Sequence, residues 1–220
     1  MLTVHHLENS RSQRVLWLLE ELELPYEIVL YKRDPQTMLA PPSLRAIHPL
    51  GKSPVVTDDG ITLAETGAIV EYLCDKAGGK LRPAAGSAAA RAFTFWLHYA
   101  EGSAMTPLLM TLVFSTMPRR APALMRGLVG SITGRAQTGF VNPQLKDHFS
   151  FIESELAATG WFAGGEFTAA DVMMSFPLEA GASRARAFAA KPHILAFLAK
   201  IHARPAYQRA LVRGGPYAYA

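Results

Sequence analysis

The first stretch whose residue types could support chemistry runs from Glu8 to Leu22, ENSRSQRVLWLLEEL. Asn9, Ser10 and Ser12 place amide and hydroxyl groups directly before a leucine-rich run with helical spacing. Such groups commonly cap the N-terminus of a helix. They could equally hold a small anionic substrate and activate its reacting atom, because a helix N-terminus carries partial positive charge. The turn by itself leaves both interpretations open.

A second candidate is the segment His48–Val56, HPLGKSPVV, in which a serine–proline bond opens an apolar run. Proline cannot donate to a β-ladder, so it is expected at the start of a strand or on its edge. The bond before it is a candidate cis peptide, which would turn the main chain of Ser53 toward an extended peptide ligand. An ordinary trans proline is the commoner arrangement, and this segment alone favours it.

A third candidate, Glu65-Thr66-Gly67, lies between an expected strand and an expected helix. Thr66 is well suited to be the N-cap. The same helix start could offer backbone N–H groups to a ligand carboxylate, and Glu65 could accept a hydrogen bond from a ligand ammonium. A cap without a ligand is the alternative.

Several other patterns favour structure over chemistry. Thr168 and Asp171 have the spacing of a capping box, so we expect Asp171 to start a buried helix. His5 and His6 are adjacent on an expected strand and point to opposite faces, and the remaining histidines are scattered and pair with no cysteine at metal-ligand spacing. A glycine-rich phosphate loop and a Gly-x-Ser-x-Gly elbow are both missing from the sequence. We therefore expect neither a metal site nor nucleotide chemistry.

The composition is that of a folded globular protein, with 50% hydrophobic and 18% charged residues in a chain of 220. The single cysteine, Cys74, excludes an internal disulfide and is expected to be a small buried residue. The N-terminus lacks an apolar stretch of signal-peptide length, so we expect a cytoplasmic protein. The longest uncharged stretch, 102–118, is slightly short for a membrane span and contains Pro107, so we predict a buried helix there.

The distribution of charge argues against nucleic acid as a partner, although the net charge is +4. Residues 1–77 hold seven Lys/Arg and eleven Asp/Glu, a net of −4, and residues 78–220 hold fifteen and seven, a net of +8. The basic residues of the second part are scattered, without the interleaved aromatics of a nucleic-acid surface. A solvated basic surface is the simpler interpretation.

The elements that must position the candidate residues change character near residue 78. Before it, the spacing predicts strands at 2–7, 26–31, 54–59 and 61–64 and helices at 13–22 and 65–77, with a proline-rich loop before the third strand. This β-α-β-loop-β-β-α order is that of a thioredoxin-like domain. A Gly/Pro-containing linker at 78–87 follows, and residues 88–220 have only helical periodicity, including 88–105, 142–157, 169–181 and 191–212.

Six motifs in this order resemble the glutathione transferase family, and within it the yeast and bacterial members. They are NSRSQRVLWLLEEL, YEIVLYKRD, APPSLRAIHPLGKSPVV, LAETGAIVEYL, YAEGS and GGEFTAADVMMSFPL, which together cover most of the chain. Each motif alone is weak, whereas the ordered set is specific. The resemblance implies an α/β thioredoxin-like domain, 1–77, that binds glutathione, and an all-α bundle, 88–220, that lines an electrophile site.

The resemblance also implies a glutathione site, position by position. Glutathione would lie extended along the strand opened by Pro54, with that peptide bond cis and the main chain of Ser53 pairing with the cysteinyl backbone. Glu65 and Thr66 match the acid–hydroxyl pair that binds the γ-glutamyl end, where many relatives have serine in the second position. Lys52 matches a polar position that contacts the glutathione backbone or a carboxylate.

The family activates the glutathione thiol with a tyrosine, serine or cysteine near the end of the first strand. This turn contains no tyrosine or cysteine, so Ser10 is our candidate, with Ser12 and Asn9 as alternatives. The thiol pKa must fall by about one or two units, which corresponds to roughly 1.4–2.8 kcal/mol. One hydroxyl donor and a helix N-terminus could supply this.

The expected function is conjugation of glutathione thiolate to hydrophobic electrophiles, as in detoxification, by a homodimer. Apolar residues early in the bundle are candidates for the electrophile wall, with bundle core as the alternative for each of them: Tyr99, Met105, Leu108, Met110 and Phe114. Two alternatives stay open on the same fold. One is glutathione-dependent reduction of peroxides or disulfides, and the other is a non-catalytic binding module.

Overall fold

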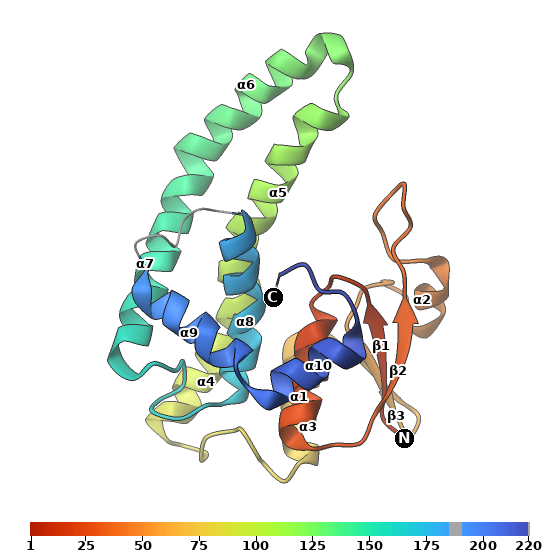
Figure 1. The fold of residues 1–220 in the computed structure, drawn as a ribbon, viewed down its shortest axis with the longest axis vertical. Helices are drawn as coiled ribbons and strands as arrows, with labels where there is room; N and C mark the ends of the chain where they lie inside the picture. Colours follow the sequence, from red (N-terminus) through yellow and green to blue (C-terminus); the bar gives the residue numbers. More distant parts are fainter. Residues whose placement is uncertain (185–190, 220) are drawn as a thin grey trace.

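The computed structural model describes residues 1–184 and 191–219, and its N-terminal part is built around a four-stranded sheet (Figure 1). The elements of this part are β1 (Thr3–Leu7), α1 (Ser12–Leu22), β2 (Glu27–Tyr31), α2 (Pro42–Ile47), β3 (Val55–Asp58), β4 (Ile61–Ala64) and α3 (Thr66–Lys76). The thioredoxin-like order predicted from the sequence is confirmed. The sequence did not predict α2, a short helix inside the proline-rich loop.

The strands are arranged in the order β2-β1-β3-β4. β1 runs parallel to β2, whereas β3 is antiparallel to both β1 and β4. The predicted hairpin turn has positive φ at both central residues, 45° at Asp59 and 86° at Gly60, as a tight two-residue hairpin requires. On β1, Val4 and His6 face α1, while Leu7 faces α2 and contacts Tyr31. The strand therefore has a buried side chain on each face.

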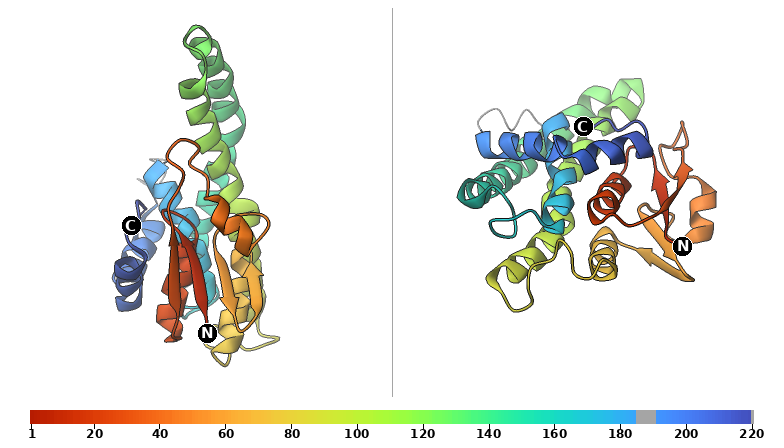
Figure 2. Two further views of the ribbon diagram at one scale, coloured as in Figure 1. Left: turned by 90° about the vertical axis from the view of Figure 1, so that its right-hand side faces the viewer. Right: turned by 60° about the horizontal axis from the view of Figure 1, so that its bottom comes forward.

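The remaining described elements are helical and lie beside the N-terminal part (Figure 2). The α-helices among them are α4 (Ala88–Tyr99), α5 (Met105–Arg120), α6 (Arg126–Ala136), α7 (Asn142–Thr159), α8 (Ala169–Arg184), α9 (Pro192–His202) and α10 (Pro205–Gly214). The helical stretch predicted at 191–212 is two helices. Arg204 is extended (φ −70°, ψ 131°) because the proline that follows it disfavours helical geometry at this position.

The prediction of a buried helix at 102–118 is wrong for most of α5. Only the beginning of this helix is buried, and Leu109, Val113 and Met117 are 50%, 43% and 45% exposed. α5 and α6 form a hairpin that projects beyond the rest of the molecule (Figures 1 and 2). An uncharged stretch can be buried without desolvating a charge. Its sequence does not show whether a neighbouring element covers it. Within the described part of the chain, no helix is both long and apolar enough to span a membrane.

A π-helical segment, Ala100–Ala104, joins α4 to α5. Pro107 has no N–H to donate to the Ser103 carbonyl, and its ring crowds that carbonyl, so a wider turn just before it relieves this contact. A second π segment, Gln137–Val141, precedes Pro143 in the same way. The first widened turn carries Glu101, which faces α1.

The last helix, α10, packs against α1 and so returns the end of the chain to its beginning (Figure 1). Trp17 of α1 meets Tyr207 edge to face, with ring centroids 5.1 Å apart. At the end of α10, a Cβ on Gly214 would lie 2.5 Å from Gln13 Oε1 and 2.8 Å from Leu16 Cδ1. Any larger residue here would require Gln13 and Leu16 to move, so glycine suits this close approach of the α10 main chain to α1.

The capping box predicted at Thr168 and Asp171 is present at the start of α8. The Asp171 carboxylate accepts the backbone N–H of Thr168 at 2.8 Å, the Thr168 hydroxyl at 3.1 Å and the backbone N–H of Phe162 at 2.9 Å. Burial raises the pKa of Asp171 to about 6 against the opposing effect of these donors, so the group is a carboxylate at neutral pH. Asp171 fixes the entry to α8 and the preceding turn.

Replacing Asp171 with alanine is expected to lower the free energy of unfolding by about 2–4 kcal/mol, because buried N–H groups would lose their acceptor. Denaturant unfolding measures this loss. Asp147→Ala, at an exposed position of α7, is the matched control and should change stability by less than about 0.5 kcal/mol. Equal effects of the two substitutions would contradict this role of Asp171.

Candidate active site

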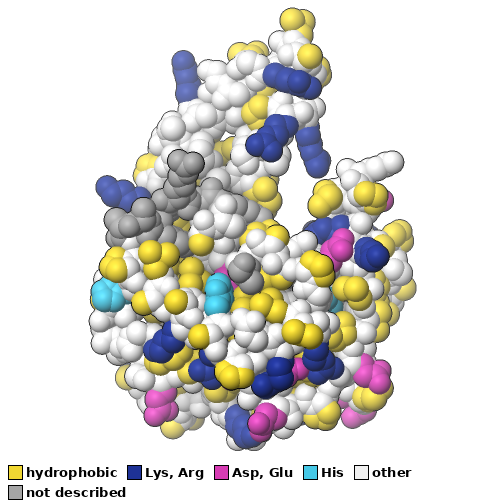
Figure 3. Space-filling view, in the orientation of Figure 1, with side chains coloured by type: hydrophobic (Ala, Val, Ile, Leu, Met, Phe, Trp, Pro, Cys, Tyr) yellow, Lys and Arg dark blue, Asp and Glu magenta, His cyan; other side chains and the backbone are white. Residues whose placement is uncertain are grey.

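A cleft of about 610 Å³ separates the N-terminal part from α5 and α8. This volume lies within the usual range for small-molecule sites. Its opening is visible between the α5–α6 hairpin and the loop after β2 (Figure 3). On the N-terminal side its wall includes Asn9, Ser10, Arg11, Lys32, Arg33, Arg45, Lys52 and Ser53, and on the helical side it includes Met105, Leu109, Leu112, Phe176 and Tyr219.

The turn between β1 and α1 brings Asn9 and Ser10 to the cleft. Asn9 has φ 49°, a left-handed conformation that asparagine tolerates better than most residues, and its Oδ1 accepts the Ala218 N–H at 2.8 Å. Ser10 Oγ accepts the backbone N–H of Ser12 at 3.2 Å at the start of α1. Ser10 therefore satisfies a donor of the helix start and also borders the cleft, so the two interpretations of this turn are compatible.

Ser12, the first alternative to Ser10, is fully buried and does not border the cleft. Its Oγ lies 2.7 Å from Ser10 Oγ and 2.7 Å from His6 Nδ1. A ligand in the cleft thus meets Ser10 before Ser12.

The Ser53–Pro54 peptide bond is cis, as the resemblance implied and as the local segment alone did not favour. The Ser53 hydroxyl donates to a carbonyl of β1 at 3.0 Å and accepts the Leu7 N–H at 3.2 Å. Since the proton of this hydroxyl is engaged in the sheet, Ser53 can donate to a ligand only through its main chain. Lys52 is exposed at the cleft wall, and Pro54 is buried behind it.

Glu65, and not the predicted Thr66, occupies the cap position of α3, and no side chain caps this helix. Glu65 is exposed and has φ 69°, a strained conformation for a residue with a side chain. Thr66 is buried, and its Oγ1 accepts from Arg14 Nη2 at 3.5 Å. Neither residue belongs to the wall of the 610 Å³ cleft. The structure therefore does not bring this pair into the same pocket as Ser10.

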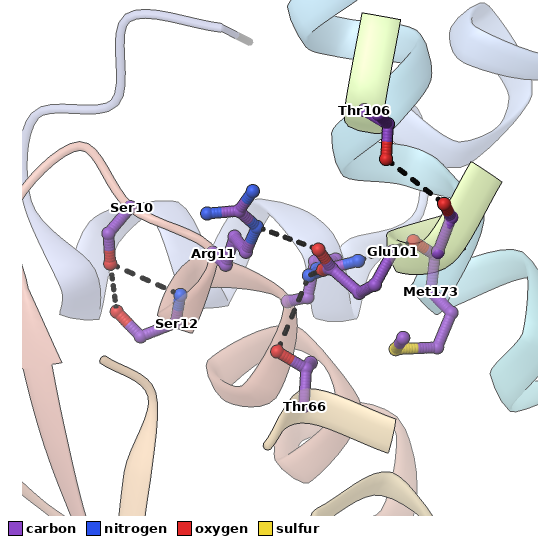
Figure 4. Close-up of polar contacts among 9 residues, drawn as sticks. Ser10, Arg11, Ser12, Thr66, Glu101, Thr106 and Met173 are labelled. Carbon is purple, nitrogen blue, oxygen red and sulfur yellow. Dashed lines mark hydrogen bonds and ion pairs between the residues drawn. The ribbon is translucent and has the colours of Figure 1, made fainter. Parts of the chain in front are cut away.

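An ion cluster around the buried Arg14, which the sequence did not predict, joins the two parts beside this site (Figure 4). Arg14 of α1 is 1% exposed and ion-paired with Glu101 of the π segment, and Arg11 Nε donates to Glu101 at 3.0 Å. Arg14 Nη1 also donates to the Met173 carbonyl of α8 at 2.6 Å. Burial would raise the pKa of Glu101, but Arg14 and Arg11 outweigh it and hold the pKa below its ordinary value.

Of the five candidates for the electrophile wall, only Met105 borders the cleft. Tyr99 is buried in the bundle, where its hydroxyl lies 2.5 Å from His148 Nδ1, and Leu108 is fully buried. Met110 packs against the core, and Phe114 borders a separate hollow with α6 and α7. The apolar wall facing Ser10 instead uses Leu109, Leu112, Phe176 and Tyr219.

The cleft wall is rich in cations that sequence reasoning did not gather, apart from Lys52. Arg33 donates to main-chain carbonyls of Glu8, Asn9 and Met38, so its charge is not neutralised by these bonds. Lys32 and Arg45 border the same cleft, where Asp34 is the acidic member of the wall. Such a surface attracts an anionic substrate. The clustering arises because the loop after β2 and the turn before β3 fold toward each other.

The described residues contain no group of three or more His, Cys, Asp or Glu side chains placed to hold a metal ion. Cys74 is fully buried in α3, and burial raises the pKa of its thiol to about 12. This side chain is therefore a core residue, as expected, and not a reactive thiolate.

Comparison with known proteins agrees with this arrangement. Residues 10–76 match the glutathione S-transferase N-terminal domain, and residues 107–205 match the C-terminal domain. The chain is 37% identical over 179 residues to glutathione S-transferase 3 of Schizosaccharomyces pombe, covering 81% of this chain and 73% of that protein. It is 34% identical over 188 residues to glutathione S-transferase 1 of Saccharomyces cerevisiae, covering 81% and 80%.

Solved structures give the same result. A glutathione S-transferase from Actinobacillus pleuropneumoniae is 31% identical, with a TM-score of 0.81 over 100% of this chain and 95% of that one. A sphingomonad glutathione S-transferase solved in complex with glutathione is 25% identical, with a TM-score of 0.74 over 97% and 98%. The chain therefore belongs to the glutathione S-transferase family and is a transferase enzyme.

Proposed function

We propose that this transferase binds glutathione along Lys52 and Ser53, ionises its thiol beside Ser10, and conjugates the thiolate to a hydrophobic electrophile. The observation that carries the proposal is that Ser10 and Ser53, from separate elements, share one cleft with an apolar wall from α5 and α8. The reaction needs a peptide-binding edge, a polar group at the sulfur and an apolar surface opposite it. The N-terminal side of the cleft supports the first two, through Ser53 and Ser10, and the helical side supports the third.

The binding of glutathione is supported by the main chain beside Pro54 and by the charge of the cleft. The edge next to the cis bond suits an extended peptide, and Lys52 and Arg45 suit its carboxylate. Glu65 and Thr66 are proposed to bind the γ-glutamyl end where it leaves the cleft. The strained φ of 69° at Glu65 supports this role, because such conformations cluster at ligand sites.

The electrophile is proposed to bind against Met105, Leu109, Leu112 and Phe176. These side chains come from two helices on the side of the cleft opposite Lys52 and Ser53. Flexible methionine and leucine side chains suit hydrophobic substrates of varied shape. Met105 thus has the role that the sequence suggested for it, whereas Tyr99, Leu108, Met110 and Phe114 are proposed to be packing residues away from this wall.

We further propose a cytoplasmic homodimer that acts in detoxification, with domain limits 1–77 and 88–220 and a linker at 78–87. Residues 185–190 and 220 of the second domain lie outside the described residues. The opposed charges of the two parts, −4 and +8, support pairing between unlike halves of two subunits. The proposed chemistry takes glutathione as its co-substrate and assigns no metal and no nucleic acid. Sedimentation at low and high salt tests the assembly.

The central test offers the enzyme glutathione together with an aryl halide, a hydroperoxide or a mixed disulfide. We expect turnover with the aryl halide and retention on immobilised glutathione. Because Cys74 is buried, glutathione itself is the thiol available to any of the three reactions. Turnover only with the hydroperoxide or disulfide would replace conjugation by reduction. Neither retention nor turnover would contradict the proposed function.

Replacing Ser10 with alanine is expected to raise the pKa of the bound glutathione thiol by about one to two units and to lower kcat/KM at neutral pH about 10- to 100-fold. Thiolate absorbance of the binary complex and initial rates as a function of pH measure the two effects. Ser154→Ala, at an exposed position of α7, is the control. An unchanged thiol pKa in Ser10→Ala would rule out Ser10 and leave Ser12 and Asn9 as the alternatives.

The substitutions Glu65→Gln and Thr66→Ala are expected to raise the KM for glutathione about 10-fold each, with a smaller effect on kcat. The first removes the negative charge that faces the ligand ammonium, and the second removes a hydroxyl that binds the γ-glutamyl end. Thr66→Ser should restore binding, since the hydroxyl is retained. Glu71→Gln, farther along α3 and paired with Arg82, is the matched control. A fall in kcat with unchanged KM would contradict a binding role.

A further inference from the structure

A continuous chain of hydrogen bonds extends behind Ser10 into the protein. Ser10 Oγ lies 2.7 Å from Ser12 Oγ, Ser12 Oγ lies 2.7 Å from His6 Nδ1, and His6 Nε2 lies 3.0 Å from the Gly214 carbonyl oxygen. Ser12 and His6 are 0% and 2% exposed. Of the side chains in this chain, that of Ser10 borders the cleft. Figure 4 shows the Ser10–Ser12 contact at the cleft end.

The proton positions along this chain follow from its far end. A carbonyl oxygen can only accept, so His6 Nε2 carries a proton and donates it to Gly214. The Nδ1 of the neutral imidazole then has a free lone pair, which the Ser12 hydroxyl meets as donor. The Leu7 carbonyl, at 3.4 Å from Ser12 Oγ, is a much poorer competing acceptor.

The Ser12 hydroxyl has one proton, and it is used on His6. Ser12 Oγ therefore accepts the proton of Ser10, whose own oxygen accepts the Ser12 N–H at 3.2 Å. In the enzyme without substrate, the Ser10 proton points away from the cleft, and an oxygen lone pair of Ser10 remains for a ligand. Ser10 is thus arranged to accept a proton from a thiol before it can donate one to a thiolate.

We propose, on the basis of the proposed function, that His6 is a positioning residue that takes up the glutathione thiol proton through Ser12 and Ser10. The S–H bond breaks and its proton passes to Ser10 Oγ. The former Ser10 proton passes to Ser12 Oγ, and the former Ser12 proton passes to His6 Nδ1. The products are a bound thiolate and an imidazolium, and no proton enters solvent.

The transfer reverses each hydrogen bond in the chain. Ser10 now donates to the thiolate, Ser12 donates to Ser10, and His6 Nδ1–H donates to Ser12. The three groups become a row of donors aimed at the sulfur, which is the polarity that stabilises an anion. The resting arrangement accepts the proton, and the product arrangement holds the thiolate.

The position of Gly214 supports the cationic form of His6. Its carbonyl lies at the C-terminal end of α10, where the helix dipole favours a positive charge. Burial lowers the pKa of the free imidazole, while the bond to Gly214 opposes this effect. The imidazole is therefore neutral before substrate binds and gains a counter-charge only when the thiolate forms. The close approach of Gly214 to Gln13 and Leu16 keeps this acceptor in place.

The test measures where the proton goes when glutathione binds at neutral pH. We expect thiolate absorbance to appear without release of a proton into a weakly buffered solution. The ¹⁵N signals of His6 should change to those of a doubly protonated imidazole. S-methylglutathione, which has no thiol proton, should bind and leave His6 neutral. Release of one proton per thiolate formed, with His6 still neutral, would overturn the relay.

Two variants separate the relay from a structural role. His6→Asn keeps an acceptor oxygen near Ser12 but cannot take up a proton, and Ser12→Ala interrupts the chain while keeping the N–H bond to Ser10. In both, we expect thiolate formation to release a proton, with a fall in kcat/KM of about 10- to 100-fold at neutral pH and little change in glutathione KM.

His5→Asn is the control, because this neighbouring buried imidazole contacts Tyr31 and Thr57 on the other face of the sheet. It should leave proton uptake and rate unchanged. Proton-neutral thiolate formation in both His6→Asn and Ser12→Ala would refute the relay. Loss of glutathione binding by the wild-type enzyme would instead refute the proposed function, so the two failures are distinguishable.

Discussion

The buried guanidinium of Arg14 is the constraint on which the geometry of the site depends. A charge that is 1% exposed must be paired and hydrogen-bonded, and its partners come from three other elements: Glu101 of the π segment, Thr66 of α3 and the Met173 carbonyl of α8. Phe176 adds its ring face, 5.4 Å from the guanidinium carbon. Moving one of these partners away would leave the buried guanidinium incompletely paired, which is energetically costly. The contacts of Arg14 therefore hold α1, α3, α8 and the π segment in fixed positions beside the cleft.

The π segment explains how Glu101 reaches this cluster. In a regular α-helix the N–H of residue 107 would donate to the Ser103 carbonyl, and proline has no N–H. A π-helical turn at Ala100–Ala104 lies just before α5, and this wider turn presents Glu101 to α1. The contact between the two parts of the enzyme is thus made by the widened turn that precedes Pro107.

The C-terminal end of the chain contacts both His6, behind Ser10, and the wall of the cleft. Gly214 contacts His6, and the tail beyond α10 contributes Tyr219 to the cleft wall and the Ala218 N–H to Asn9. The tail is held by Glu179, a buried carboxylate of α8 that accepts from the hydroxyls of Tyr207 and Tyr217 at 2.8 Å and 2.6 Å. The turn that carries Ser10 is therefore positioned by residues about two hundred positions away in the sequence.

The sequence by itself determined the order of elements in the N-terminal part, and it pointed to Asn9, Ser10, Lys52 and Ser53, which the structure places in one cleft. Alternating and helical periodicities predict local structure because each depends on neighbours a few residues apart, and the motif around Ser10 and the Ser53–Pro54 bond are local for the same reason. Reasoning from the sequence failed where burial depends on distant partners. The exposed length of α5, the cap position of Glu65 and the positions of Tyr99 and Phe114 away from the cleft were not predictable from spacing.

Only the tertiary structure decided which polar groups act together. The sequence gives no indication that His6 has a functional role, because adjacent histidines on a strand point to opposite faces and no metal-ligand spacing is present. Its contact with Ser12 depends on the packing of β1 against α1, and its contact with Gly214 depends on the return of α10 across 208 positions. The direction of a hydrogen-bond chain is fixed by the one member that can only accept, and here that member is a main-chain carbonyl, which no side-chain motif can reveal.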